Sequence, residues 1–258
     1  MAIKMIVTDL DRTLLRDDKT ISEYTSNTLE ELARRGIPFV IATARPARAV
    51  RKAMPWLRYD GAVFFNGAVV MAGEESLGAY KVEGAFRIVT DILRERPGTL
   101  LSVEMDDYLY SNIPPEGMGD WGSDYCYTTD FKETAGRLVE KILISSKELP
   151  SERWMEEYAR YIPQGLYMQM SENTLIMVMN RQATKLGGIR LLAERCGVGL
   201  SEITAFGDDV NDIDMLRECG TGVAVGNALP EVKAVADEVC GSNEEDGVAR
   251  WIGENVLA

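Results

Sequence analysis

The sequence contains no histidine. This absence excludes Ser-His-Asp and Cys-His catalysis, and it also excludes zinc sites built on imidazole ligands. Any proton transfer must therefore fall to Asp, Glu, Lys, Tyr or Cys side chains.

Cysteines are few and long apolar runs are missing. No apolar stretch approaches the ~20 residues that cross a bilayer, so we expect no membrane span. The chain enters an apolar strand almost at its start, which argues against a signal peptide. Without CxxC spacing, the cysteines are expected to be free thiols, mostly buried, in a reducing compartment, so we expect a cytoplasmic protein. The four are Cys126, Cys196, Cys219 and Cys240.

Basic residues are outnumbered. Lys and Arg total 28 against 41 Asp and Glu, so the formal net charge is −13. This balance disfavours nucleic acid or an anionic membrane as a partner. It still allows a small anionic substrate, because a bound cation and a few local Lys or Arg side chains can reverse the local field. The sequence favours neither a monomer nor a homodimer.

The most informative stretch is Asp9-Leu10-Asp11-Arg12-Thr13, which follows an apolar run at residues 3–8. That run is typical of a buried parallel strand. In open α/β sheets, ligands bind at the carboxyl ends of the strands. Asp9 and Asp11 therefore indicate a metal site, a nucleophile, or both. The alternative is a turn in which the two acids only cap backbone N–H groups.

The pattern of elements predicts two folding units. Strands and helices alternate as β-α-β-α-β up to about residue 81 and again from about residue 182, which implies a parallel sheet with right-handed crossovers. Between these stretches, helices mix with antiparallel strand candidates, as in a separate α+β unit. Its expected helices are 86–96, 132–140 and 151–161, its expected strands are 100–110, 141–145, 166–170 and 174–179, and the methionines of the last two strands are expected to fill the core.

Three more groups follow predicted strands or open predicted helices. Thr43 ends a strand at 37–42 beside a helix N-terminus, where anions bind, although alone it is typical of an N-cap. Lys185 opens a helix at 184–196 against the macrodipole, so an acid is expected nearby, although alone it is typical of a solvated lysine. Residues 207–212, Gly-Asp-Asp-Val-Asn-Asp, follow an apolar strand and offer the oxygen ligands that suit Mg²⁺.

Taken together, these features resemble the four motifs of the haloacid dehalogenase (HAD) superfamily of phosphotransferases, in the family's order. Residues 9–13 match DxDxT, Thr43 and Lys185 match the single Thr and Lys, and residues 207–212 match GDxxND. Arg12 departs from the pattern, because the family usually has Gly there.

The spacing of the motifs resembles that of one subfamily. Residues 44–184 separate the second motif from the third, so the inserted segment lies there, as in the Cof-type phosphatases of HAD subfamily IIB. The resemblance implies a Rossmann-like α/β core at 1–81 and 182–258 with an inserted α+β cap domain at 82–181. It is supported by Ile41–Pro46 (IATGRP in the family, with Ala44 replacing Gly), by the NGA turn at 66–68 and by the DGVA sequence at 246–249.

The resemblance also implies roles for individual residues. Asp9 would be the nucleophile that forms an aspartyl-phosphate, and Asp11 the acid and base. Asp9, Asp208 and the Asp11 carbonyl oxygen would hold Mg²⁺. Arg45 would be a second contact to the anion, although it is equally typical of a surface arginine in the first turn of a helix. The residues expected to bind the phosphoryl group are Thr43, Ala44, Arg45, Lys185 and Asn211, and those expected to support the metal ligands are Thr13, Asp209 and Asp212.

The implied function is an Mg²⁺-dependent phosphatase acting on small phosphate monoesters, such as sugar phosphates or phosphorylated cofactors. One alternative is a phosphomutase such as phosphomannomutase, which shares this layout and returns the phosphoryl group to a sugar. Another is a non-catalytic domain, either a receiver-like signalling domain whose aspartate stores phosphate or a binding domain. Receiver domains lack an inserted cap of this size, and the complete set of acids argues against a binding relic.

Overall fold

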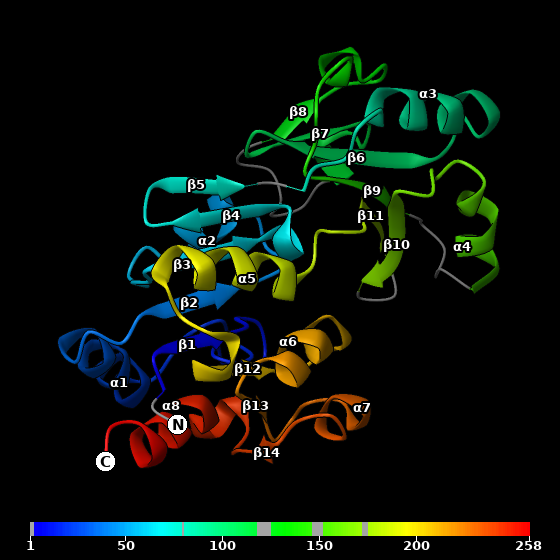
Figure 1. Cartoon of the computed structure of the whole chain (residues 1–258). Helices are drawn as coiled ribbons and strands as arrows, with labels where there is room; N and C mark the ends of the chain where they lie inside the picture. The colour runs from blue at the N-terminus through cyan, green and yellow to red at the C-terminus, as the bar shows by residue number, and fades with distance from the viewer. Residues whose placement is uncertain (1–2, 79, 118–124, 146–151, 172–174) are drawn as a thin grey trace. The chain divides into compact units, whose positions relative to one another are not determined.

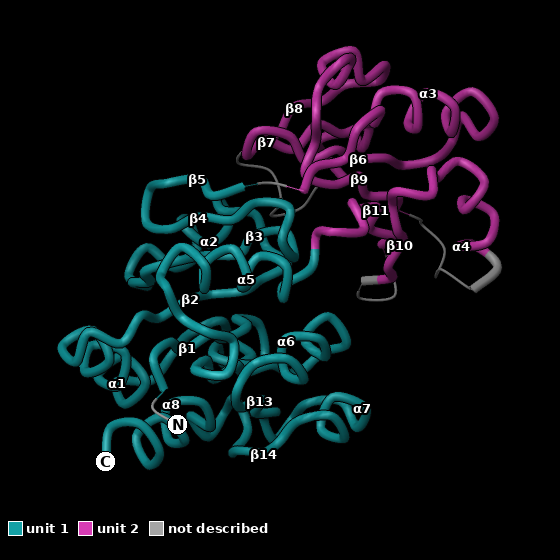
Figure 2. Tube along the Cα trace, in the orientation of Figure 1, with its two compact units in different colours: residues 1–79, 184–258 teal, residues 80–183 magenta. Residues whose placement is uncertain are grey.

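The chain forms two compact units in the computed structural model, which describes residues 3–78, 80–117, 125–145, 152–171 and 175–258. The first unit contains Met1–Ala79 and Thr184–Ala258, and the second contains Tyr80–Ala183 (Figure 2). The segment expected to be inserted, 82–181, lies inside the second unit.

The first unit is built on an eight-stranded sheet with the order β14-β13-β12-β1-β2-β3-β4-β5 (Figure 1). The pairs from β14 to β3 are parallel, and β4 and β5 continue the sheet in antiparallel pairing. The predicted α/β class with a central parallel sheet is confirmed. The strands are β1 Met5–Thr8, β2 Phe39–Ala42, β3 Gly61–Phe64, β4 Val69–Ala72, β5 Glu75–Gly78, β12 Ile203–Gly207, β13 Thr221–Ala224 and β14 Glu238–Val239.

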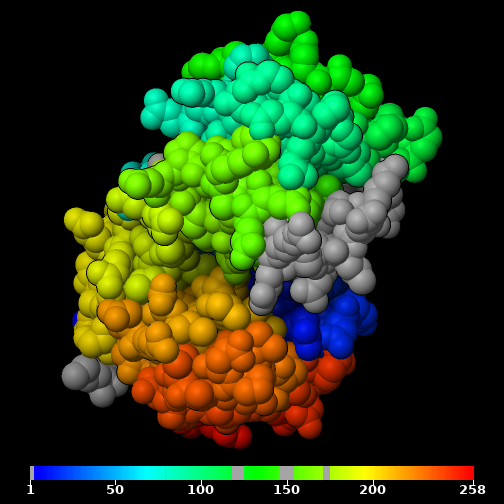
Figure 3. All heavy atoms as spheres, turned by 90° about the vertical axis from the view of Figure 1, so that its right-hand side faces the viewer, coloured from blue at the N-terminus to red at the C-terminus, as the bar shows by residue number. Residues whose placement is uncertain are grey.

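The helices of this unit begin and end where local sequence dictates. The Ser22 side chain accepts a hydrogen bond from the backbone N–H of Thr25 and caps α1, and Thr184 caps α5 in the same way. Gly197 ends α5 with φ 65°, a left-handed conformation that glycine adopts readily. The helices are α1 Glu23–Arg34, α2 Ala47–Ala53, α5 Lys185–Cys196, α6 Ile213–Glu218, α7 Pro230–Lys233 and α8 Gly247–Asn255. The segment from α6 to α7 forms much of one face of this unit (orange in Figure 3).

The sheet places the predicted site residues at one edge. β1 lies between β12 and β2, and all residues of these three strands are buried. Asp9 directly follows β1, Thr43 directly follows β2 and Asp208 directly follows β12. Because these strands are parallel, their carboxyl ends meet at the same edge.

The second unit has a six-stranded sheet with the order β10-β11-β9-β6-β7-β8. One apolar cluster includes buried residues of α3 and β6, with Met168 and Met170 packed against it. A smaller cluster includes Met177 and Met179, so the prediction that these methionines fill the core is confirmed. The elements are α3 Ala85–Glu95, β6 Leu100–Met105, β7 Tyr108–Ser111, β8 Tyr125–Tyr127, β9 Lys141–Ser145, α4 Glu152–Ala159, β10 Leu166–Ser171 and β11 Leu175–Asn180.

Several expectations about local structure were wrong. No helix forms at 132–140: a single 3-10 turn spans Lys132–Thr134 and Gly136 then takes φ 71°, which interrupts helical geometry. The β5 strand was missed because it is short and largely polar. The cysteines are free, but Cys126 and Cys196 are exposed, since they lie on an edge strand and at a helix end.

The expected hairpin between β10 and β11 forms as an antiparallel pair. Residues 172–174 of its turn lie outside the described residues. None of the helices in the described part of the chain is long and apolar enough to cross a membrane.

Candidate active site

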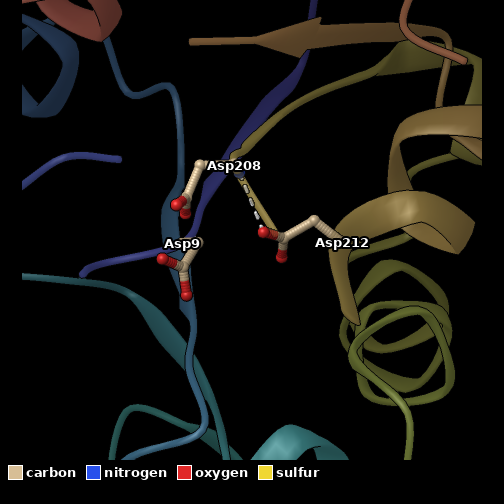
Figure 4. A group of neighbouring side chains, drawn as sticks. All are labelled: Asp9, Asp208 and Asp212. Atoms are coloured by element: carbon tan, nitrogen blue, oxygen red, sulfur yellow. Dashed lines mark hydrogen bonds between the residues drawn. The ribbon is translucent and has the colours of Figure 1, made fainter. Parts of the chain in front are cut away.

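Three buried carboxylates meet at the edge of the first unit's sheet. Asp9, Asp208 and Asp212 each offer one oxygen, and these oxygens lie within 4.8 Å of one another (Figure 4). Asp9 and Asp208 converge because β1 and β12 pair in parallel, with Thr8 opposite Phe206. The exposed fractions of the three residues are 6%, 7% and 0%.

Asp212 is held by the backbone of its own loop. Its Oδ2 accepts hydrogen bonds from the N–H groups of Asp208 at 3.0 Å and Asp209 at 3.1 Å. Gly207 makes this geometry possible, because a Cβ at that position would lie 2.4 Å from the Cβ of Asp212. The loop therefore requires glycine at the first position of its motif.

Lys185 supplies the positive charge of the cluster. Its Nζ donates to Asp9 Oδ1 and to Asp212 Oδ1, each at 2.6 Å, and its side chain is 1% exposed. Helix α5 packs closely on β3, because Gly188 lies against Val63, where a Cβ on Gly188 would have no room. The interpretation of Lys185 as a solvated lysine is therefore wrong, and the expected neighbouring acid is present.

The charges of the cluster do not cancel, since three carboxylates face one ammonium. Burial, assisted by the neighbouring acids against the pull of Lys185, raises the pKa of Asp9 to about 8. Burial also raises the pKa of Asp208 to about 6. Burial acts to lower the pKa of Lys185, but Asp212 and Asp9 outweigh it and raise that pKa. A buried, oxygen-rich site with excess negative charge suits a divalent cation such as Mg²⁺.

Asp11 is not part of this cluster. Arg45 donates to both of its carboxylate oxygens, Nε to Oδ2 at 2.6 Å and Nη2 to Oδ1 at 2.7 Å, and Lys19 donates to Oδ1 at 2.8 Å. Partial burial acts to raise the pKa of Asp11, but the hydrogen bonds from Arg45 and Lys19 prevail and lower it. The interpretation of Arg45 as a surface arginine is therefore wrong, because its guanidinium is paired with Asp11.

The backbone at Arg12, directly after Asp11, explains why the family usually has Gly at this position. Arg12 takes φ 60°, in the left-handed region where glycine is favoured, which accounts for the usual Gly. Arg12 is exposed, and its carbonyl oxygen accepts a hydrogen bond from Asn227 Nδ2 at 2.7 Å. Thr13, two residues after Asp11, donates a hydrogen bond from its Oγ1 to Asp208 Oδ1 at 2.8 Å.

Thr43 and Asp209 take different positions at the site. Thr43 is 1% exposed and its Oγ1 accepts from the N–H of Arg45 at 3.1 Å, with Ala44 between them. The interpretation of Thr43 as a helix N-cap is wrong, since Pro46 occupies the cap position of α2. Asp209 is exposed and accepts from the N–H of Val210, so its side chain turns away from the cluster.

Two residues near the site were given no role in it by the sequence. Asn66 accepts a hydrogen bond from Asn211 at 3.0 Å, whereas the NGA sequence at 66–68 supported only a resemblance in its turn. Lys19, which contacts Asp11, sits at a turn with φ 66°. Residues 17–20 are polar, as is typical of a turn, but such a pattern does not give the direction of a lysine side chain.

Comparison with known proteins shows the family. A haloacid dehalogenase-like hydrolase family model matches residues 6–252. The 5-amino-6-(5-phospho-D-ribitylamino)uracil phosphatase YitU of Bacillus subtilis is 32% identical, over 97% of this chain and 96% of that protein.

Solved structures show the same fold. A sugar phosphatase of HAD subclass IIB superposes with a TM-score of 0.83 at 24% identity, covering 99% of this chain and 100% of its own. A Thermotoga maritima protein superposes with a TM-score of 0.86 at 26% identity, covering 98% and 97%. The family model, which matches nearly the whole chain, and this relative together show the class of enzyme: the chain belongs to the haloacid dehalogenase-like hydrolases and is a phosphatase with the subclass IIB fold.

Proposed function

We propose that this phosphatase hydrolyses small phosphate monoesters with Mg²⁺ and through an aspartyl-phosphate on Asp9. The observation that carries the proposal is the buried cluster of Asp9, Asp208 and Asp212 around the ammonium of Lys185. Burying several acids together costs free energy of folding. Clusters of this kind are concentrated at functional sites, where that cost is retained.

The residues present fit a divalent cation. Three buried carboxylates face the single ammonium of Lys185, so the cluster has acidic oxygens to spare for a cation. Asp9, Asp208 and the Asp11 carbonyl oxygen would hold the ion, while Thr13 and Asp212 keep Asp208 in place through the contacts described above. When bound, the ion offsets the repulsion between a carboxylate nucleophile and a phosphate dianion.

In the proposed reaction, the chain's own groups move one phosphoryl group and one proton. An oxygen of Asp9 forms a bond to phosphorus as the ester P–O bond breaks, and Asp11 gives its proton to the departing oxygen. Water then attacks phosphorus, Asp11 takes a proton from it, and orthophosphate leaves with Asp9 restored. Lys185, Thr43 and Asn211 would donate hydrogen bonds to the phosphoryl oxygens.

The contacts of Asp11 add a requirement to this scheme. A carboxylate held by two cations does not keep a proton, so Asp11 serves as an acid only after Arg45 has left it. A phosphoryl group offers Arg45 the same bidentate geometry as a carboxylate. We therefore propose that Arg45 turns from Asp11 to the substrate when the ester binds.

The names of two similar proteins support a narrower substrate class. One acts on a phosphate carried by a ribityl chain and another is a sugar phosphatase. Both names describe a phosphate on a sugar-derived carbon chain, so we propose that class here, which includes phosphorylated cofactor precursors. We also propose that the second unit acts as a cap that selects the alcohol.

For the cellular setting, we propose the cytoplasm, because the free cysteines fit a reducing compartment.

The proposal is tested by trapping the intermediate. Asp11→Asn keeps the side-chain shape but cannot carry the proton for the second step. With p-nitrophenyl phosphate, whose leaving group needs little protonation, the variant should accumulate protein that is one phosphoryl group heavier by intact mass. The matched control is Asp9→Asn, which should show neither added mass nor turnover.

Two results would contradict the proposal. One is turnover of an alkyl phosphate by Asp11→Asn at the parent rate, which would remove Asp11 from the reaction. The other is transfer of phosphate from a sugar bisphosphate back to a sugar at a rate that exceeds release of orthophosphate, which would favour the phosphomutase.

A further inference from the structure

The turn that follows β3 is held against three segments of the site. The N–H of Asn66 donates to the carbonyl oxygen of Thr43 at 3.0 Å, and the N–H of Phe65 donates to that of Arg45 at 3.1 Å. Gly67, at φ 110°, packs on the backbone of Thr184, where a Cβ would lie 2.3 Å from the carbonyl oxygen. Thr184 directly precedes Lys185, so the turn is fixed to both segments.

The side chain of Asn66 reaches a third segment. It is 2% exposed, and its Oδ1 accepts a hydrogen bond from Asn211 Nδ2 at 3.0 Å. The two residues are far apart in sequence, and this bond joins the turn after β3 to the loop after β12. The backbone of Asn66 is left-handed, at φ 54° and ψ 24°, a conformation that asparagine tolerates better than most residues.

The hydrogen bond between Asn66 and Asn211 adds little to the free energy of folding. Among the described residues, neither Asn66 Nδ2 nor Asn211 Oδ1 has a hydrogen-bond partner, and both atoms are buried. A buried polar atom without a partner costs about 1–3 kcal/mol, and two such atoms offset the gain from the single bond between the amides. Buried polar groups of this kind in a native fold need an explanation, and a role at a catalytic site is one.

We infer that Asn66 is a positioning residue that holds the carboxamide of Asn211 for contact with the phosphoryl group. The inference rests on the proposed function, in which Asn211 donates to a phosphoryl oxygen. Asn211 itself is only partly buried, and its amide would rotate without the bond to Asn66. The rigid attachment of the turn to Thr43 and Thr184 makes Asn66 a fixed point from which Asn211 is aimed.

The test is a double-mutant cycle on p-nitrophenyl phosphate hydrolysis by the full chain. Asn66→Gly removes the side chain and keeps the left-handed backbone, and Asn211→Ala removes the group that Asn66 positions. Each single variant should lower kcat/KM on the order of 10-fold, mainly through kcat. Because Asn66 acts through Asn211, the double variant should be no slower than Asn211→Ala alone.

A matched control removes another left-handed polar side chain. Asp106 takes φ 52° in the second unit, and its side chain pairs with Lys81 and Arg137 rather than with a site residue. Asp106→Gly measures the effect of deleting such a side chain on folding. It should leave kcat for p-nitrophenyl phosphate within about 2-fold of the parent, well below the 10-fold loss expected of a displaced phosphoryl contact.

The outcomes separate the alternatives. Multiplicative losses in the double variant would overturn the inference, because Asn66 would then act independently of Asn211. So would a lower melting temperature for Asn66→Gly with kcat/KM unchanged, which indicates a structural role alone. The Asp9→Asn control reports on the proposed function separately: if that variant retains turnover, the proposed nucleophile is wrong, whatever the cycle shows.

Discussion

Lys185 and Lys19 both form ion pairs with aspartates of the site, but the pairs of Lys185 are buried and the pair of Lys19 is largely exposed. Lys185 Nζ lies 2.6 Å from both Asp9 and Asp212, and the exposed side-chain fractions are 1%, 9% and 0%. Lys19 Nζ lies 2.8 Å from Asp11, with exposed fractions of 45% and 34%. Replacing each lysine by Met keeps most of the stem and removes only the charge and its donors.

The buried pair should dominate stability. Removing one partner of a buried ion pair costs roughly 3–5 kcal/mol, because the other charge is left uncompensated. An exposed pair contributes roughly 0–1 kcal/mol. With an m-value of about 3 kcal/mol/M, Lys185→Met should lower the urea midpoint by about 1–1.7 M, and Lys19→Met by about 0.3 M or less.

Urea unfolding followed by circular dichroism, in excess EDTA and again in excess Mg²⁺, measures both variants. Mg²⁺ should stabilise Lys185→Met more than the parent, since the ion replaces part of the lost positive charge. The kcat/KM of Lys185→Met should also fall roughly 10²-fold, as for other preorganised contacts to a transferring group. Equal urea midpoints for the two variants in EDTA would refute the argument from burial.

Two further predictions follow from the site and from the turn after β3. Hydrolysis of p-nitrophenyl phosphate should stop in excess EDTA and return with added Mg²⁺, because three buried acids face a single ammonium; undiminished turnover in the chelator would contradict the metal-dependent reaction. Gly67→Ala should lower the free energy of unfolding by well over 1 kcal/mol, because its Cβ would meet the carbonyl of Thr184. Gly73→Ala is the control for urea unfolding: Gly73 is also left-handed, at φ 56°, but no described heavy atom lies within 4 Å of its Cβ position. Only the conformational cost of about 1–2 kcal/mol therefore applies to it, so Gly67→Ala should be the more destabilising change. Equal losses for the two variants would show that the Thr184 contact is unimportant.

Local sequence determined the elements and the chemistry of the core unit. Apolar runs that end in acids indicated β1 and β12, and the helix expected at 184–196 forms as α5 behind its cap Thr184, because these features depend on neighbours within a few residues. The resemblance of four motifs to those of the family, in the same order, was enough to identify the family and the phosphatase class. The absence of histidine by itself limited proton transfer to a few residue types.

Only the tertiary structure decided which of these groups meet. Lys185 lies far in sequence from Asp9, and its burial between two acids depends on how α5 packs through Gly188 on Val63. In the same way, the Arg45 and Lys19 contacts of Asp11 and the bond between Asn66 and Asn211 join segments whose approach no local pattern encodes. The sequence indicated which residues can bind, but long-range packing set their charge partners, and therefore their pKa values.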